Sequence, residues 1–266
     1  MSPPSAAAVT DPRVAAVEQN LLDQLEIFAG APGMRSAGLA GVTAYHSDVA
    51  FPLFNAIGAA EFADEPDVTA QVARVVSHFV DRGLPFLWWP TPSTTSPALE
   101  QALLASGLVA EPITGMYAEP AGAVAAEAPT GTRLVVDPSA QQVAEAMVAA
   151  FAMPPAIVDA LRGLVAALPA ARTRNLLLLE GDRLLGCGTL FCTGDVAGLY
   201  NIATVEGARR RGIGRAMTRL LLRLGQEHGA TRAVLHATPM GLPLYARLGF
   251  EAVCAMPQYL WVPAGL

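Results

Sequence analysis

Hydrophobic patterns of two different periods alternate along the second half of the chain, and each stretch predicts one element. Residues 132–136, TRLVV, form a short apolar run that predicts a strand. In residues 137–151 the apolar positions recur with helical spacing, and Asp137 followed by Pro138 predicts the cap and the first turn of a helix. A second helix is predicted over residues 156–168.

Residues 174–204 contain three apolar runs that are separated by two Gly-Asp pairs, at 181–182 and 194–195. Gly with Asp between runs of β-forming residues is typical of tight hairpin turns. This segment therefore predicts an antiparallel meander of three strands.

After residue 204 the pattern changes to a helix that ends near Gly229, with Leu220, Leu221 and Leu224 as its buried stripe. The remaining elements follow in order: a strand at 232–238, a short helix at 241–249 and strands near 250–253 and 258–262. This order predicts an α/β (α+β) fold with a mixed, mostly antiparallel central sheet flanked by helices.

The first half of the chain contains a degraded copy of the same order. PLFNAIGAA resembles GLYNIATVE, and the match pairs Asn55 with Asn201. Gly83 precedes Gly229 by the same 146 residues, and Gly107 aligns with Gly249 further on. We interpret this as an internal duplication of about 130 residues, against the alternative of a chance match of scattered glycines.

A segment of small residues, 121–131, separates the two copies and has no hydrophobic period. It predicts an interdomain linker between a first domain at 1–120 and a second domain at 132–266. With 266 residues, the chain is long enough for two such domains.

Composition narrows the classes of protein. No apolar run approaches the roughly 18 residues that span a bilayer, which predicts a soluble protein with no membrane partner. The first ten residues lack the pattern of a secretory signal, so we expect a cytoplasmic location. Cys187, Cys192 and Cys254 have no metal-type spacing, and we expect buried reduced thiols and no metal.

Charge is distributed unevenly between the halves. All 17 basic residues are Arg, and the absence of Lys excludes a Walker-type phosphate loop and a Schiff-base lysine. Residues 1–130 carry a net charge of −10 and residues 131–266 carry +4, which together give the net −6 of the chain. An anionic ligand therefore belongs to the second half.

Three consecutive arginines, Arg209 to Arg211, stand directly before the helix that ends at Gly229. Cations are unfavourable at a helix N-terminus unless an anion binds there, and glycines let a pyrophosphate approach the main chain. Further arginines recur every four residues at 215, 219 and 223, and a solvated helix face explains the last two.

A dinucleotide-binding fold is disfavoured because Met217 stands where the third glycine belongs. Nucleic-acid binding through the arginine stripe is disfavoured by the pI near 5.2.

The stretch RRRGIG after an antiparallel strand resembles the acetyl-CoA signature of the GCN5-related N-acetyltransferase (GNAT) family, R/Q-x-x-G-x-G/A. PLYARLGF is similar to the final helix of that family. The resemblance covers residues 132–262 and implies a GNAT fold in two tandem copies. It implies that the pantetheine arm of acetyl-CoA pairs with Ile202, Ala203 and Thr204, and that the pyrophosphate contacts Arg209, Arg210, Arg211, Gly212, Ile213, Gly214 and Arg215.

The same resemblance implies that Tyr245 is the general acid that protonates the departing CoA thiolate. For the general base His236 is the nearest titratable residue, although a lone His on a strand is more often structural. Tyr200, Glu206 and an ordered water are the alternatives, and a main-chain N–H near Ala203 is expected to hold the oxyanion.

The first copy differs at the corresponding positions, and we expect that it does not bind CoA in the same way. Acidic residues stand where the second copy has its arginine loop: Glu61, Asp64, Glu65 and Asp67. Leu103 aligns with Tyr245, and Trp88 and Trp89 are expected on opposite faces of a strand.

The expected function is an N-acyltransferase that moves acetyl from acetyl-CoA to a primary amine of unknown identity, with no nucleic-acid partner. The alternative is a non-catalytic acyl-CoA sensor or assembly protein, which would have no use for Tyr245. A homodimer is a further hypothesis.

Overall fold

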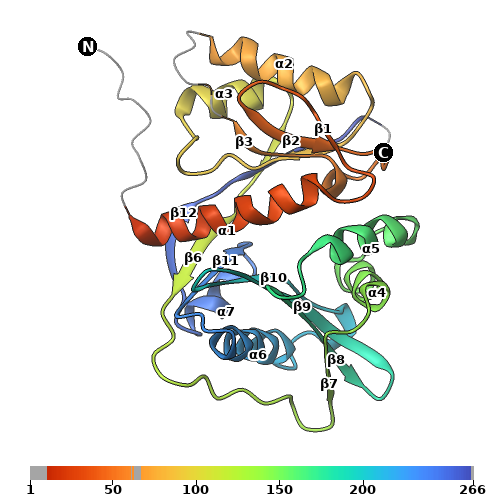
Figure 1. Ribbon diagram of the computed structural model, residues 1–266, viewed down its shortest axis with the longest axis vertical. Helices are drawn as coiled ribbons and strands as arrows, with labels where there is room; N and C mark the ends of the chain where they lie inside the picture. The colour runs from red at the N-terminus through yellow and green to blue at the C-terminus, as the bar shows by residue number, and fades with distance from the viewer. Residues whose placement is uncertain (1–10, 61, 63–66, 265–266) are drawn as a thin grey trace. The chain divides into compact units, whose positions relative to one another are not determined.

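A computed structural model describes residues 11–60, 62 and 67–264 (Figure 1). The chain divides into two compact units, one made of residues 1–115 with 253–266 and the other of residues 116–252. Each unit contains its own sheet and its own hydrophobic core.

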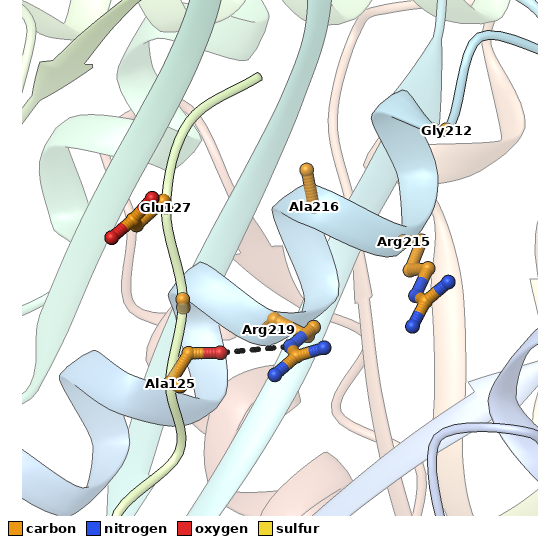
Figure 2. Close-up of a pocket in the computed structure, with 7 residues that line it drawn as sticks. Ala125, Glu127, Gly212, Arg215, Ala216 and Arg219 are labelled. Carbon is orange, nitrogen blue, oxygen red and sulfur yellow. Dashed lines mark hydrogen bonds between the residues drawn. The ribbon is translucent and has the colours of Figure 1, made fainter. Parts of the chain in front are cut away.

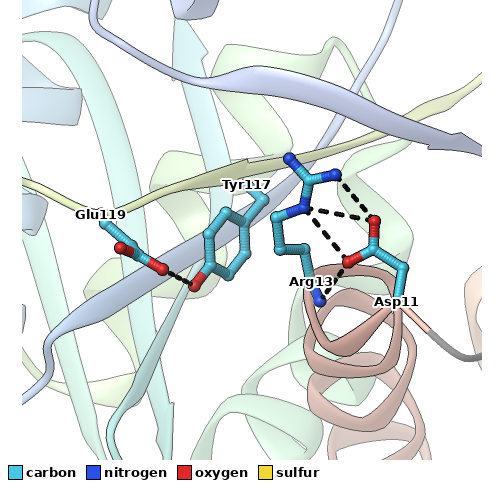
Figure 3. Close-up of polar contacts among 4 residues, drawn as sticks. All are labelled: Asp11, Arg13, Tyr117 and Glu119. Carbon is cyan, nitrogen blue, oxygen red and sulfur yellow. Dashed lines mark hydrogen bonds and ion pairs between the residues drawn. The ribbon is translucent and has the colours of Figure 1, made fainter.

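The first unit is built on a six-stranded sheet with the order β1-β2-β3-β4-β13-β5. Helix α1 begins after Asp11, whose carboxylate accepts the main-chain N–H of Arg13 at 2.9 Å and pairs with the guanidinium of the same residue (Figure 3). The elements are α1 (Pro12–Ala29), β1 (Arg35–Ser36), β2 (Val42–His46), η1 (Pro52–Phe54), β3 (Ala56–Ala60), α2 (Val68–Val80), β4 (Phe86–Trp88), α3 (Pro97–Ala105), β5 (Val109–Glu111) and β13 (Gln258–Trp261).

The second unit is built on a seven-stranded sheet with the order β12-β6-β11-β10-β9-β8-β7. Tyr117 on β6 is buried, and its hydroxyl donates to Glu119 Oε1 at 2.6 Å (Figure 3). Burial and this carboxylate raise the pKa of Tyr117 to about 12. The elements are β6 (Thr114–Ala118), β7 (Arg133–Val136), α4 (Ala140–Phe151), η2 (Pro155–Ile157), α5 (Val158–Ala167), β8 (Thr173–Glu180), β9 (Arg183–Thr193), β10 (Val196–Thr204), η3 (Glu206–Ala208), α6 (Ile213–Glu227), β11 (Arg232–Ala237), α7 (Leu242–Ala246) and β12 (Glu251–Ala255).

The meander expected from the Gly-Asp pairs is present as β8, β9 and β10, which pair antiparallel in chain order. Gly181 and Gly194 hold the first position of each two-residue turn at φ 59° and 56°, where a glycine avoids the steric cost of a Cβ. Helix α6 packs on one face of these strands through its leucine stripe, and α4 covers the other face (Figure 1).

The cap of α4 differs from the sequence prediction. Ser139, not Asp137, is the N-cap, because Ser139 and Gln142 form a capping box. Asp137 lies two residues earlier with φ 49°, and its carboxylate accepts the main-chain N–H of Asn175 at 3.1 Å. Asp137 therefore fastens the end of β7 to β8 instead of beginning the helix.

The units do not follow the expected boundaries at 120 and 132. The final strand, β13, lies between β4 and β5 in the sheet of the first unit, whereas β6 lies between β12 and β11 in the sheet of the second. A strand's sequence pattern shows which of its faces is buried, but it does not show which edges it will pair with. Their order in the sequence therefore placed β6 and β13 in the wrong sheets.

A parallel pair stands beside antiparallel strands in each sheet, β3 with β4 in the first and β10 with β11 in the second. However, Asn55 and Asn201 are not equivalent. Asn55 directly precedes the paired residues of β3, and its amide bonds main-chain groups that include Pro85 O at 3.0 Å. Asn201 instead lies two residues after Leu199, which is the last residue of β10 that pairs with β11.

Within the described residues, no helix is both long enough and apolar enough to cross a membrane. Cys187 and Cys192 are buried and Cys254 is partly buried, and all three are free thiols.

Candidate functional site

The site begins where β10 separates from β11. These strands pair in parallel from Val196 to Leu199, and the ladder stops at the Leu199–Leu235 pair. Strand β10 continues to Thr204, but there it pairs only with β9. The edge of β10 from Tyr200 to Thr204 that faces away from β9 is therefore open, as expected for the strand before the arginine loop.

A bulge decides which main-chain groups face this open edge. The pairing of β10 with β9 shifts between Tyr200–Thr189 and Ala203–Cys187, so β10 holds one extra residue. Val205 N–H donates to Leu185 O at 3.0 Å, and the alternation of an antiparallel ladder then directs the N–H of Ala203 to β9 as well. The main-chain groups of Ile202 and Thr204 point to the open edge. The N–H of Ala203, near which the oxyanion donor is expected, therefore faces β9 and not the open edge.

The arginine loop leads from this edge into α6. After η3, Arg210 adopts a left-handed conformation with φ 61°, and Gly212 follows as the N-cap of α6 with φ 78°. The first bond of the helix runs from Ala216 N–H to Gly212 O at 3.0 Å, which leaves the N–H groups of residues 212–215 outside the helical ladder. No side chain of the described residues caps this terminus. The loop has the geometry of an anion cradle.

Arginines surround this cradle, and not all of them are equally available. Arg209, Arg210, Arg211 and Arg215 are exposed at the loop. Arg211 Nη2 contacts Glu180 Oε1 on β8 at 2.5 Å. This ion pair raises the pKa of Arg211 and lowers that of Glu180. Glu180, which lies 31 residues from Arg211 in the sequence, therefore neutralises the charge of one loop arginine.

Beside the cradle lies a pocket of about 360 Å³ between α6 and the expected linker (Figure 2). Arg219 Nε donates to Ala125 O at 2.9 Å, and Arg223 Nη1 donates to Ala126 O at 2.6 Å. One turn further on, Gln226 bonds both Gly122 O and Val124 N–H. The interpretation of Arg219 and Arg223 as a solvated face is therefore wrong: both hold the linker on α6. The pocket lining is Ala125, Ala126, Glu127, Gly212, Arg215, Ala216 and Arg219.

Tyr245 lies on α7, next to the start of α6. A Cβ placed at Gly214 would lie 3.3 Å from Leu244 of α7, so the two helices approach closely at this point. The ring of Tyr245 packs edge-on against Phe250, with centroids 6.1 Å apart. Burial raises the pKa of Tyr245 to about 12, and the phenol is therefore protonated at neutral pH.

His236 and Tyr200 lie where β10 and β11 separate. The parallel register places them on the same face of the sheet, and their ring centroids are 5.9 Å apart. Burial lowers the pKa of His236 to about 4, so the imidazole is neutral at pH 7 but is a weak proton acceptor. Glu206, the third candidate base, is exposed on η3.

The corresponding region of the first unit differs in chemistry. Asp67 is the N-cap of α2, where its carboxylate accepts the N–H of Ala70 at 2.9 Å. Leu103 is fully buried in the core, and Trp88 is fully buried while Trp89 is partly exposed, as expected for opposite faces. The other acidic positions of the expected loop, Glu61, Asp64 and Glu65, lie outside the described residues.

Sequence reasoning missed a polar chain on β8, β9 and β10. Thr189 Oγ1 donates to Asn175 Oδ1 at 2.9 Å and accepts from Asn201 Nδ2 at 3.3 Å. Asn201 has φ 53°, a conformation in which Asn is enriched among the non-glycine residues. The signal for it in the sequence was Asn201, a polar residue within the mostly apolar stretch VAGLYNIAT.

Residues 171–252 match the sequence model of the acetyltransferase (GNAT) domain. The chain resembles a GCN5-related N-acetyltransferase from Kribbella flavida, with a TM-score of 0.68 and 18% identity over 97% of this chain and 98% of that one. It also resembles a GCN5-related N-acetyltransferase from Sphaerobacter thermophilus, with a TM-score of 0.60 and 17% identity over 82% and 76% of the two chains.

A tandem GNAT protein from the clavulanic acid biosynthesis pathway gives a TM-score of 0.60 and 13% identity over 96% of both chains. Comparison with curated proteins gave no match. The expected GNAT fold is confirmed, and a solved tandem protein shares it over nearly the whole chain. At these identities the likeness to the solved structures concerns the fold alone.

Proposed function

Because this chain carries a GNAT acetyltransferase domain, we propose that the protein transfers acetyl from acetyl-CoA to a primary amine. The observation that carries the proposal is the continuity of two features. The open edge of β10 ends at the arginine loop, and this loop leads directly into the uncapped N-terminus of α6. An extended arm that ends in a pyrophosphate matches both features at once.

In the proposed complex the pantetheine arm lies along the open edge and pairs with the main-chain groups of Ile202 and Thr204. The pyrophosphate accepts the N–H groups of residues 212–215, where the helix dipole favours negative charge. Arg209, Arg210 and Arg215 add charge-assisted hydrogen bonds. Arg211 contributes less because Glu180 already pairs with it.

The chemistry requires that one C–N bond forms while one C–S bond breaks. The amine nitrogen attacks the thioester carbonyl, and an open N–H of β10 holds the oxygen that gains negative charge. The sulfur leaves with the C–S bonding electrons and receives a proton from the Tyr245 hydroxyl. The attacking nitrogen loses one proton, which restores the phenol through solvent, so the protons balance.

The raised pKa of Tyr245 limits how this acid works. A thiol titrates near 8.5, so full transfer from a phenol with a pKa of about 12 is uphill by about 5 kcal/mol. Tyr245 therefore acts first as a hydrogen-bond donor to the developing thiolate, and the proton moves only as the C–S bond breaks.

The amine must be neutral before it attacks. With a pKa of about 4, His236 is too weak a base to deprotonate an ammonium group, and it remains the weaker candidate. We propose that the amine loses its proton to solvent and that Tyr200 and His236 line the entry to the acyl group. The ratio kcat/KM should then rise with pH up to the pKa of the amine.

The test of the proposed function is the Tyr245→Phe variant, which removes the hydroxyl and keeps the packing ring. We expect kcat with an amine panel to fall roughly 10- to 1000-fold, while the Kd of acetyl-CoA measured by calorimetry stays within about twofold. Calorimetry should also give one acetyl-CoA per chain, because the first unit has acidic residues, Asp67 among them, where the second has its arginine loop.

The second candidate function, a non-catalytic acyl-CoA sensor, predicts a different outcome. A sensor would bind acetyl-CoA with the same affinity but form no acylated amine detectable by mass spectrometry with any member of the panel. Equal rates for Tyr245→Phe and the unmodified enzyme, measured when chemistry limits turnover, would remove Tyr245 from the mechanism.

A further inference from the structure

The hydrogen-bonded polar side chains on β8, β9 and β10 connect the buried part of the sheet to the point where the edge of β10 opens. Thr189 is 2% exposed, and it is the buried link between Asn175 on β8 and Asn201 on β10. Its hydroxyl uses its one proton toward Asn175 and a lone pair toward Asn201. Asn201 is the first residue of the bulge, at the point where the edge of β10 opens.

These polar side chains also hold the unusual backbone conformation of Asn201. Its φ of 53° is a left-handed conformation, which persists only where the surroundings determine it. The side chain is held by Thr189, and the carbonyl of Asn201 accepts the thiol of Cys187 at 3.5 Å. On the far side, the carbonyl of Asn175 accepts the main-chain N–H of Asp137 at 2.8 Å, and the N–H of Asn175 donates to the Asp137 carboxylate at 3.1 Å. The chain is therefore anchored at both ends.

The bulge matters because a shift of one residue in register exchanges the main-chain groups that face the neighbouring strand with those that face away from it. Tyr200 pairs with Thr189, so a ladder without a bulge would pair Ile202 with Cys187. The N–H groups of Ile202 and Thr204 would then face β9, and that of Ala203 would face the open edge. The extra residue at Asn201 reverses this choice.

We propose that Thr189, acting through Asn201, is a positioning residue that selects which amides of β10 face acyl-CoA. The proposal rests on the function proposed above. Thr189 does not touch the substrate in this account, since it acts by holding the left-handed residue that begins the bulge. Loss of the tether should misalign the open amides while leaving the arginine loop intact.

The experiment uses the full chain and two probes that reach different parts of the site. Acetyl-CoA uses both the open edge and the α6 cradle, whereas 3′-phosphoadenosine 5′-diphosphate lacks the pantetheine arm and uses the cradle alone. In Thr189→Val, which has nearly the same shape, we expect acetyl-CoA to bind about 10-fold more weakly and the nucleotide probe to bind within about twofold of the unmodified protein. Thr189→Ser should restore the affinity for acetyl-CoA.

Thr173→Val is the matched control. Thr173 is a buried threonine on β8, 5% exposed, and its hydroxyl has no hydrogen-bond partner among the described residues. Thr173 pairs with Phe191 and so lies on the same face of the sheet as Thr189. We expect this variant to bind both probes normally.

A merely structural role would weaken both probes alike or neither, and unchanged acetyl-CoA binding in Thr189→Val would overturn the proposal. Should Thr189→Val fail to fold, Asn201→Gly provides the same test, because glycine accepts φ 53° but lacks the tethered side chain. It should show the same difference between the probes. Failure of the proposed function is distinguishable in the unmodified protein. If the site does not take CoA, that protein binds neither probe, and if the protein is a sensor, it binds both probes but forms no acylated amine.

Discussion

The anion cradle can be tested by adding a single methyl group at Gly212. This residue has φ 78°, and a Cβ built there meets no protein atom within 4 Å. Gly212→Ala therefore creates no clash in the folded protein, and its folding cost is that of a left-handed alanine, about 1–2 kcal/mol. The melting temperature should fall by about 2–8 °C.

The effect on binding has a separate cause. The new methyl group occupies the space through which a pyrophosphate would approach the N–H groups of residues 212–215, and we expect acetyl-CoA to bind at least about 10-fold more weakly. At a ligand concentration of 100 times the original Kd, the unmodified protein gains about 2.7 kcal/mol of stability. The variant should gain about 1.4 kcal/mol or less under the same conditions. Thermal shift and calorimetry measure the two effects independently.

Gly194→Ala is the matched control for the folding cost. Gly194 has φ 56° and also has no protein atom within 4 Å of an added Cβ, but it lies in the β9–β10 turn. It should lower the melting temperature by a similar amount and leave the affinity for acetyl-CoA unchanged. If Gly212→Ala loses stability but keeps its affinity within twofold, the assignment of the cradle is wrong.

Two further predictions concern His236 and the linker. Because the pKa of His236 falls from 6.5 to about 4 on folding, the unfolded state binds its proton first, and about 3 kcal/mol of stability should be lost as the pH falls through this range. His236→Phe should remove that share of the pH dependence in denaturant titrations, and an unchanged slope would contradict the burial of the imidazole. Arg223→Met removes the bond to Ala126 O, worth about 1.5 kcal/mol, so a Glu-specific protease should cut after Glu127 about 10-fold faster. Arg162→Met, on an exposed face of α5, should leave this rate unchanged.

The sequence determined the features whose causes are local. Gly-Asp pairs at two-residue turns predicted the meander, and the leucines of 220–224 predicted the buried face of α6. The order Arg209, Gly212, Gly214 predicted the loop that leads into α6, because backbone conformation at a glycine and charge at a helix terminus depend on residues close together in the chain.

Only the tertiary structure decided the features that depend on strand pairing. The partner of Arg211 is Glu180, and the partners of Arg219 and Arg223 are linker carbonyls some 94 and 97 residues away. The exchange of β6 and β13 between the sheets and the bulge at Asn201 are further examples. The hydrophobic pattern of a strand repeats every two residues and specifies its faces, whereas its neighbours and register are set by hydrogen bonds to distant segments. For that reason the sequence located the arginine loop, but the amides that face the open edge of β10 could be identified only in the folded sheet.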